Sequence, residues 1–247
     1  HSALSWRFLS ASWQHADITQ GGIFPAILGS LLLGLGVMLV SFPLGMGTAV
    51  FLTEYRSHKL WTRTIQLAIR NLAGVPSVVY GLFGLAVFAQ ALNFGMSLLS
   101  AVLTLSIMTL PWIITAAVEA LESVPRKFRE SSLALGATHL QTTWLIVLPA
   151  ALPGSITGGI LGLARAMGET APLILVGATF FLSRLPSSPL DPFMALPYHT
   201  FILATQHSSP SAIRYAAGTA LVLILLTVAL SAAALLLRSR ARRRKDW

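Results

Sequence analysis

The stretch "SVPRKFRESSLALGATHLQTTWLIVLPAALPG", residues 123–154, decides how the rest of this chain is interpreted. It opens with a short polar segment and then passes into a long apolar one. Its spacing is specific. Glu130 is followed by two small residues, three residues precede Gly136, and nine more lead to "IVLP" at 146–149. The pattern indicates a polar excursion between two apolar helices.

Local signals within this stretch predict a helix, a turn and a second helix. Pro125 suits the first turn of a helix, Gly136 is a natural helix stop, and Thr138 can cap the helix that follows. Such a hairpin would offer an apolar surface to a groove on a soluble partner. The residues available for that contact are Phe128, Leu133 and Leu135.

Composition places the hairpin in a membrane protein. Hydrophobic residues make up 55% of the chain, charged residues 10%, and the mean hydropathy is +0.74, values that a water-exposed surface does not carry. About 20 apolar residues span a bilayer as a helix, whereas a barrel needs alternating polarity. We therefore predict an all-α, polytopic transmembrane helix bundle. The uncharged stretches are 18–53, 71–118, 131–164 and 215–237.

Five spans are expected. The long stretch 71–118 divides into two because "NFGM" at 93–96 supplies turn residues. The spans are 24–52, 76–92, 98–118, 150–175 and 215–237. The predicted segments are an outer N-terminal segment 1–22, a transmembrane domain 23–237, a cytoplasmic loop 121–143, an outer loop 183–213 with one helix on the outer surface, and a basic cytoplasmic tail 238–247.

Basic residues set the expected orientation, because Lys and Arg are retained on the cytoplasmic side. With the C-terminus inside, thirteen basic residues fall inside, among them Arg56 and the tail "RSRARRRK", and only Arg7, Arg184 and Arg214 fall outside. Five spans then place His1 outside, so we expect an upstream span missing from this sequence. The net charge of +9 is attributed to the basic residues that hold the chain in this orientation in the membrane. Nucleic-acid binding by the tail is the alternative, and we expect no nucleic acid among the partners.

The chain has no ATP site of its own. A P-loop needs a glycine-rich turn ending in Lys-Ser or Lys-Thr, and Lys59, Lys127 and Lys245 all lie in other contexts. We therefore expect no cofactor on this chain and no enzymatic activity.

The spacing at 130–149 resembles the EAA motif of ABC-transporter permeases, with Ser131 and Ser132 in place of the usual Ala-Ala. Together with "LAGVPSVVYGLFGL" (72–85) and "RAMGETAP" (165–172), the chain resembles the PstA-type permeases of bacterial phosphate ABC importers. The resemblance implies a type I, MetI-like fold in the bacterial inner membrane. It also implies a PstC-like second permease, two PstB-like ATPase subunits that bind ATP and Mg, and a PstS-like periplasmic phosphate-binding protein. The ATPase-coupling residues would be Arg126, Phe128, Glu130, Ser131, Ser132, Leu133, Gly136, Ala137 and Thr138.

Arg165 and Glu169 are candidates for the substrate pathway. A charge in a bilayer costs about 2.5 to 3.5 kcal/mol, so each must face the bundle interior, water or a partner. Residues at i and i+4 share a helix face, and arginine donates two parallel hydrogen bonds to an oxyanion. A carboxylate can accept a hydrogen bond from the P–OH of phosphate, which sulfate lacks. The alternative is structural: the two neutralise each other or pair with the second permease.

Three further residues near this pair are weaker candidates. Thr170 could donate to the anion, although a hydroxyl more often bonds its own helix. Ser77 and Tyr80 follow a Gly-Val-Pro break and could line the path, although plain helix packing is the simpler reading. Pro172 could kink the helix beside the pair. No metal site is expected, since His139 has no companion ligand at suitable spacing.

Other functions remain open at this point. A permease for sulfate or molybdate is the nearest alternative to phosphate transport. An ion-coupled secondary transporter would commonly show internal repeats, which are not evident. A purely structural membrane subunit would leave the spacing at 130–149 unexplained.

Overall fold

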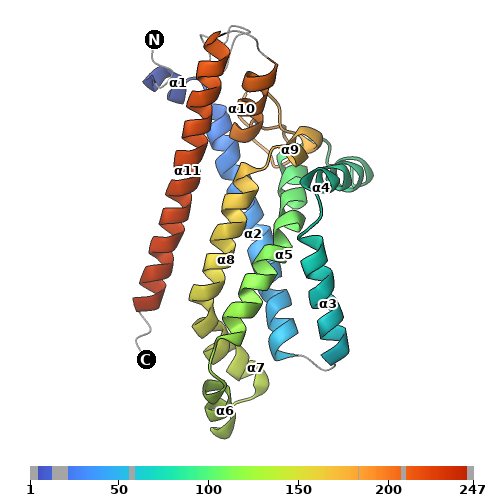
Figure 1. Cartoon of the computed structure of the whole chain (residues 1–247), viewed down its shortest axis with the longest axis vertical. Helices are drawn as coiled ribbons and strands as arrows, with labels where there is room; N and C mark the ends of the chain where they lie inside the picture. The colour runs from blue at the N-terminus through green and yellow to red at the C-terminus, as the bar shows by residue number, and fades with distance from the viewer. Residues whose placement is uncertain (1–4, 13–21, 56–58, 183, 207–209, 244–247) are drawn as a thin grey trace. The chain divides into compact units, whose positions relative to one another are not determined.

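Figure 1 shows the computed structural model of the chain, which describes residues 5–12, 22–55, 59–182, 184–206 and 210–243. Within these ranges every regular element is a helix, and the single β-type contact is an isolated bridge between Ala178 and Phe193. The all-α prediction is therefore confirmed for the described part. Residues 1–4 and 13–21 of the N-terminal segment, Arg56 and residues 244–247 of the basic tail lie outside it.

Among the described residues, four helical segments are long and apolar enough to cross a membrane. They contain α2 (Phe24–Glu54), α5 (Leu98–Glu122), α8 (Leu148–Gly168) and α11 (Pro210–Arg243). The third segment starts earlier, at α7 (His139–Thr142), and passes through a π-helical stretch, η2 (Thr143–Val147). These four segments agree with four of the five predicted spans.

The predicted span 76–92 is less regular. It comprises α4 (Ser77–Gly84) and a π-helical stretch, η1 (Leu85–Ala91), and it counts as a fifth span only when joined across a break to α3 (Lys59–Leu72). The turn at "NFGM" is where we expected it. Asn93 and Gly95 both have positive φ, 55° and 65°, which asparagine and glycine tolerate best.

The predicted helix 150–175 is wrong as a single element. The structure ends α8 at Gly168 and begins α9 (Ala171–Val176) after two non-helical residues. Pro172 occupies the first turn of α9, where its missing N–H has no helical partner to lose. The proline therefore accompanies a complete break in the helix and not a kink within it.

The residues form two compact units, whose boundaries fall inside α2, α5, α8 and α11 and in the break between α3 and α4. The first unit comprises 1–38, 76–107 and 165–229, and the second comprises 39–75, 108–164 and 230–247. Each unit is described separately below.

In the first unit, residues 193–203 pack into the core. The helix expected within 183–213 is present as α10 (Leu196–Thr205), and five of its residues are buried. Leu196 and Met194 join a buried cluster with Ile23, Ala26 and Phe8, the last from α1 (Trp6–Ser10). The preceding loop also caps α5, because the amides of Leu98 and Leu99 donate to the carbonyls of Asp191 and Pro189 at 3.0 and 2.8 Å.

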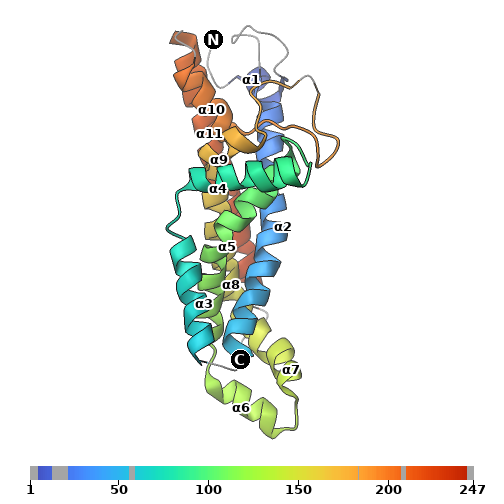
Figure 2. The same ribbon diagram turned by 90° about the vertical axis from the view of Figure 1, so that its right-hand side faces the viewer.

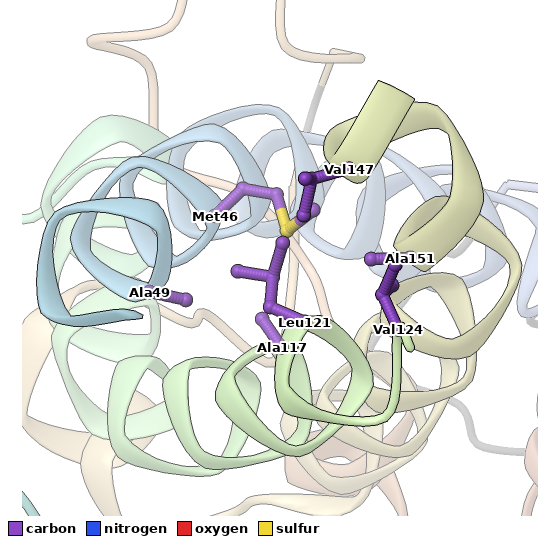
Figure 3. Close-up of a cluster of buried hydrophobic side chains, with 7 residues drawn as sticks. All are labelled: Met46, Ala49, Ala117, Leu121, Val124, Val147 and Ala151. Carbon is purple, nitrogen blue, oxygen red and sulfur yellow. The ribbon is translucent and has the colours of Figure 1, made fainter. Parts of the chain in front are cut away.

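The second unit is held by an apolar cluster drawn from four segments (Figure 3). Its members are Met46, Ala49, Ala117, Leu121, Val124, Val147 and Ala151. Helices α5 and α8 approach closely beside it because Gly154, Gly158 and Gly162 lie four residues apart and therefore on one face of α8. A methyl group on Gly154 or Gly158 would run into Ala120 or Ala116 of α5, which is the small-residue contact typical of membrane helices.

Candidate functional site

The charged pair lies at the break between α8 and α9. Arg165 Nε is 3.7 Å from Glu169 Oε1, and the side chains are 42% and 17% exposed. Arg165 is in the last turn of α8, where a cation is favoured by the partial negative charge of the helix end. Glu169 lies just past that end, so the two residues face each other although they do not share one helix. Within one helix the order Arg before Glu is the less favourable one for such a pair, but Glu169 lies beyond the end of α8.

The neighbouring candidates come from α4, which packs on α9 in the first unit. An added Cβ on Gly81 would lie 2.8 Å from the Cα of Pro172, which shows how closely the two helices approach. Tyr80, beside it, is buried and lies within electrostatic range of Arg165. Ser77 is the half-buried first residue of α4, and half-buried Thr170 precedes α9. The structure therefore gathers Tyr80, Arg165 and Glu169.

The second candidate region is the α6–α7 hairpin of the second unit, formed by α6 (Arg126–Ala134) and α7. It projects past the ends of α2, α3 and α5 (Figure 2). Pro125 is the N-cap of α6, one position before the first turn where we expected it. Gly136 has a φ of 86°, a left-handed conformation that glycine adopts without strain. Thr138 forms a capping box with Gln141 at the start of α7, which confirms the predicted helix, turn and helix.

Most of the predicted coupling residues are on the surface of this hairpin. Phe128, Leu133 and Leu135 are 46%, 37% and 89% exposed, so the hairpin presents apolar side chains at its surface. Arg126, Glu130, Ser131, Gly136 and Thr138 are also exposed, while Ala137 is half-buried. Ser132 differs in role, because its hydroxyl bonds Thr142 Oγ1 at 2.9 Å and ties α6 to α7.

Sequence reasoning missed the residue that holds this hairpin. From the sequence alone, Arg129 is one of the thirteen basic residues placed inside, and nothing local assigns it a further role. In the structure its guanidinium lies 2.7 Å from Glu54, the last residue of α2, and donates to the carbonyls of Val124 and Leu121 at 2.7 and 2.9 Å. The two charged residues are 75 positions apart, so no spacing rule could have paired them.

A polar groove of about 580 Å³ opens beside this ion pair. It lies between the ends of α2 and α5 and the first turns of α6. It is lined by Thr53, Glu54, Glu122, Val124, Arg126, Arg129 and Glu130. No group of three His, Cys, Asp or Glu residues suited to a metal ion occurs within the described ranges. The groove is thus lined by side chains of both charges.

The family described as binding-protein-dependent transport system inner membrane component matches residues 41–245 of the chain. Among curated relatives, a probable ABC transporter permease protein, YqgI of Bacillus subtilis, is 32% identical over 94% of this chain and 83% of that protein. The phosphate transport system permease protein PstA 1 of Mycobacterium tuberculosis is 34% identical over 96% of this chain and 78% of that protein.

Solved structures show the same fold. The inward-facing MetNI methionine ABC transporter contains a chain that superimposes with a TM-score of 0.68 at 19% identity, covering 89% of this chain and 94% of that one. A chain of a bacterial transporter that imports alginate superimposes with a TM-score of 0.60 at 16% identity, over 91% and 80%. The MetI-like fold expected from the sequence is therefore confirmed.

Proposed function

The chain belongs to the family of binding-protein-dependent transport system inner membrane components, and from that premise we propose that it is the permease subunit of an ATP-driven phosphate importer. It is a multi-pass protein of the bacterial inner membrane and forms half of the translocation pathway for inorganic phosphate. ATP hydrolysis belongs to separate subunits. The observation that carries the choice of substrate is the 34% identity with a phosphate permease over nearly the whole chain.

The partner set of such an importer completes the proposal. A second, PstC-like permease forms the other half of the path, two PstB-like subunits hydrolyse ATP, and a PstS-like protein delivers phosphate from the periplasm. The C-terminus lies in the cytoplasm, on the same side as the α6–α7 hairpin. The exposed Phe128, Leu133 and Leu135 support docking of the hairpin on an ATPase subunit.

Arg165 and Glu169 handle the anion in this proposal. The Arg165 side chain is 42% exposed in the single chain, and a charge in the membrane needs water or a partner surface, which the face shared with the second permease would supply. Arginine presents paired N–H donors to phosphate oxygens. Glu169 accepts a hydrogen bond from a protonated phosphate oxygen and so disfavours sulfate, which carries no proton at neutral pH.

Uptake of radiolabelled phosphate by the assembled complex in proteoliposomes tests this proposal. We expect uptake to require ATP and to persist in excess sulfate or molybdate. Competition by either anion would favour the alternative oxyanions, and uptake without ATPase subunits would favour a secondary transporter. Failure of the wild-type complex to take up phosphate would refute the proposed function.

Two variants separate a pathway role from structural pairing. Arg165→Gln removes charge-assisted hydrogen bonds to the anion, so we expect uptake to fall about tenfold or more while assembly is retained. Arg214→Gln, at another exposed arginine of the first unit, is the control and keeps wild-type uptake. Recovery of uptake in the double variant Arg165→Gln, Glu169→Gln would show that the pair merely neutralises itself.

A further inference from the structure

Arg129 joins the α6–α7 hairpin to two membrane helices at one point. Its Nε lies 3.2 Å from both carboxylate oxygens of Glu54, and its Nη2 lies 2.7 Å from one of them. Nη1 donates to the carbonyl of Val124, and Nη2 also donates to that of Leu121. All three nitrogens of the guanidinium are therefore engaged. Arg129 and the three residues that accept its hydrogen bonds are called the Arg129 clamp below. The three acceptors are Glu54, Leu121 and Val124.

The clamp acts at the ends of helices. Glu54 is the last residue of α2, and Leu121 is in the last turn of α5. Carbonyl groups in the last turn of a helix lack partners within it, and a basic side chain can satisfy them. A carboxylate at a helix C-terminus is unfavourable beside the helix dipole. Arg129, which belongs to α6, therefore donates a hydrogen bond to a carbonyl in the last turn of α5. It also neutralises the carboxylate of Glu54 at the end of α2.

The clamp is also continuous with the apolar core. The side chains of Leu121 and Val124, whose carbonyls Arg129 holds, lie in the cluster drawn in Figure 3, with Met46 of α2 and Val147 of η2. Val124 precedes the hairpin and Val147 follows it, so both ends of the hairpin enter one packed cluster. Arg129 and Glu54 are 21% and 10% exposed, so solvent screens this ion pair less than a surface pair.

We propose that Arg129 is a positioning residue that transmits movement of the α6–α7 hairpin to α2 and α5. This inference rests on the proposed function, in which the hairpin docks on an ATPase subunit. Without the hydrogen bonds of Arg129, the N-terminal turn of α6 could move without displacing the ends of α2 and α5. With the clamp in place, a displacement of α6 must either break the hydrogen bonds and ion pair of Arg129 or move the ends of α2 and α5 as well. Glu54 and Arg129 thus convert ATPase movement into movement of the membrane helices.

Variants of the two charged residues separate the two connections. Arg129→Gln releases both α2 and α5, whereas Glu54→Ala releases α2 and leaves the carbonyl contacts intact. Arg129→Lys retains the charge but offers one nitrogen where three are used, so it cannot span the same acceptors. Lys127→Gln is the control, because Lys127 is an exposed cation two residues away on the same helix.

The experiment measures phosphate uptake and ATP hydrolysis in the same proteoliposomes containing the full complex. We expect Arg129→Gln to lower phosphate transported per ATP hydrolysed about tenfold, the scale of losing hydrogen bonds to a charged group, while the ATPase subunits remain bound. Arg129→Lys and Glu54→Ala should show smaller losses, and Lys127→Gln none. A wild-type ratio in Arg129→Gln and Glu54→Ala would overturn the inference.

A second measurement does not depend on transport. The chain has no cysteine, so spin labels can be placed at exposed Leu44 of α2 and exposed Ala134 of α6 without removing native thiols. We expect a narrow distance distribution in the wild type and a broad one in Arg129→Gln. An unchanged distance distribution in Arg129→Gln would overturn the inference about Arg129, whichever substrate the complex carries. A wild-type complex that shows the narrow distribution but takes up no phosphate would refute the proposed function alone.

Discussion

The closest approach of α5 and α8 provides a quantitative test of the fold that carries Arg165. At Gly154, an added Cβ would lie 2.8 Å from the Cβ of Ala120, whereas ordinary contacts lie between 3.4 and 4 Å. The helices would have to part by at least 0.6 Å, the difference between 3.4 and 2.8 Å. At Gly158 the overlap with the Cβ of Ala116 is more severe. Gly158→Ala should therefore be the more harmful of the two substitutions.

The expected loss follows from three contributions. Overpacking a tight contact costs about 1 to 3 kcal/mol, and Gly158 should lie near the upper end. A gap of about 0.5 to 1 Å also forfeits a quarter to a half of the dispersion energy at neighbouring contacts, including the one between Gly162 and Ile113. Alanine returns about 1 kcal/mol of helix propensity. The net destabilisation of Gly158→Ala is about 1 to 2 kcal/mol, or roughly 2 to 8 °C in Tm.

Thermal unfolding of the chain in detergent, followed by far-ultraviolet circular dichroism, measures this effect. Gly47→Ala is the matched control, because Gly47 lies in α2 and an added Cβ there meets no atom within 4 Å. It should raise the Tm slightly. The double variant Ala116→Gly, Gly158→Ala moves the methyl group from one helix to the other and should recover most of the loss. If Gly158→Ala melts no lower than Gly47→Ala, the proposed packing of α8 on α5 is incorrect.

Three further predictions concern the polar segments. Thr138→Ala removes the capping box with Gln141 and should loosen α7 by about 0.5 to 2 kcal/mol, seen as faster hydrogen exchange of the Gln141 amide. Hydrogen bonds from the backbone and hydroxyl of Ser187, followed by the backbone of Ser188, lower the pKa of Asp191. The stabilisation of this loop is therefore present above the ordinary value of 3.8 and is lost as the pH falls through the lower folded-state pKa. Limited proteolysis of the loop against pH would show it, and Asp191→Asn should remove that dependence. Leu135→Asp places a charge on an 89% exposed residue and should weaken copurification of the ATPase subunits about tenfold without changing the Tm of the chain. Full copurification would argue against docking through Leu135.

The prediction of the bundle depended on features that are local in sequence. Uncharged runs long enough to span a bilayer predicted five spans, since each span satisfies its own backbone hydrogen bonds, and four of them are long helical segments in the structure. The hairpin at 125–143 was also predictable, because Gly136 and Thr138 act on the few residues beside them. The spacing that led to the family is likewise a property of one continuous stretch.

The charged site was predicted only in part. Arg165 and Glu169 were identified because charges are rare among apolar residues, but the expected continuous helix was wrong. Glu169 and Thr170 interrupt it, and Pro172 starts the next helix. Pro172 was recognised as a disturbance. Whether a proline bends a helix or separates two depends on what its neighbours pack against, and here Gly81 of α4 makes room for it.

The sequence by itself determined that the chain is a helical membrane protein with a polar hairpin, because hydropathy, capping and turn chemistry act over a few residues. Only the tertiary structure decided that Arg129 closes on Glu54 and on the end of α5. That contact joins residues 75 positions apart, and it forms because folding brings together two helix ends whose unpaired carbonyls and carboxylate need a cation. No local sequence pattern predicts this contact, because the carbonyls and the carboxylate come together only when the helices pack.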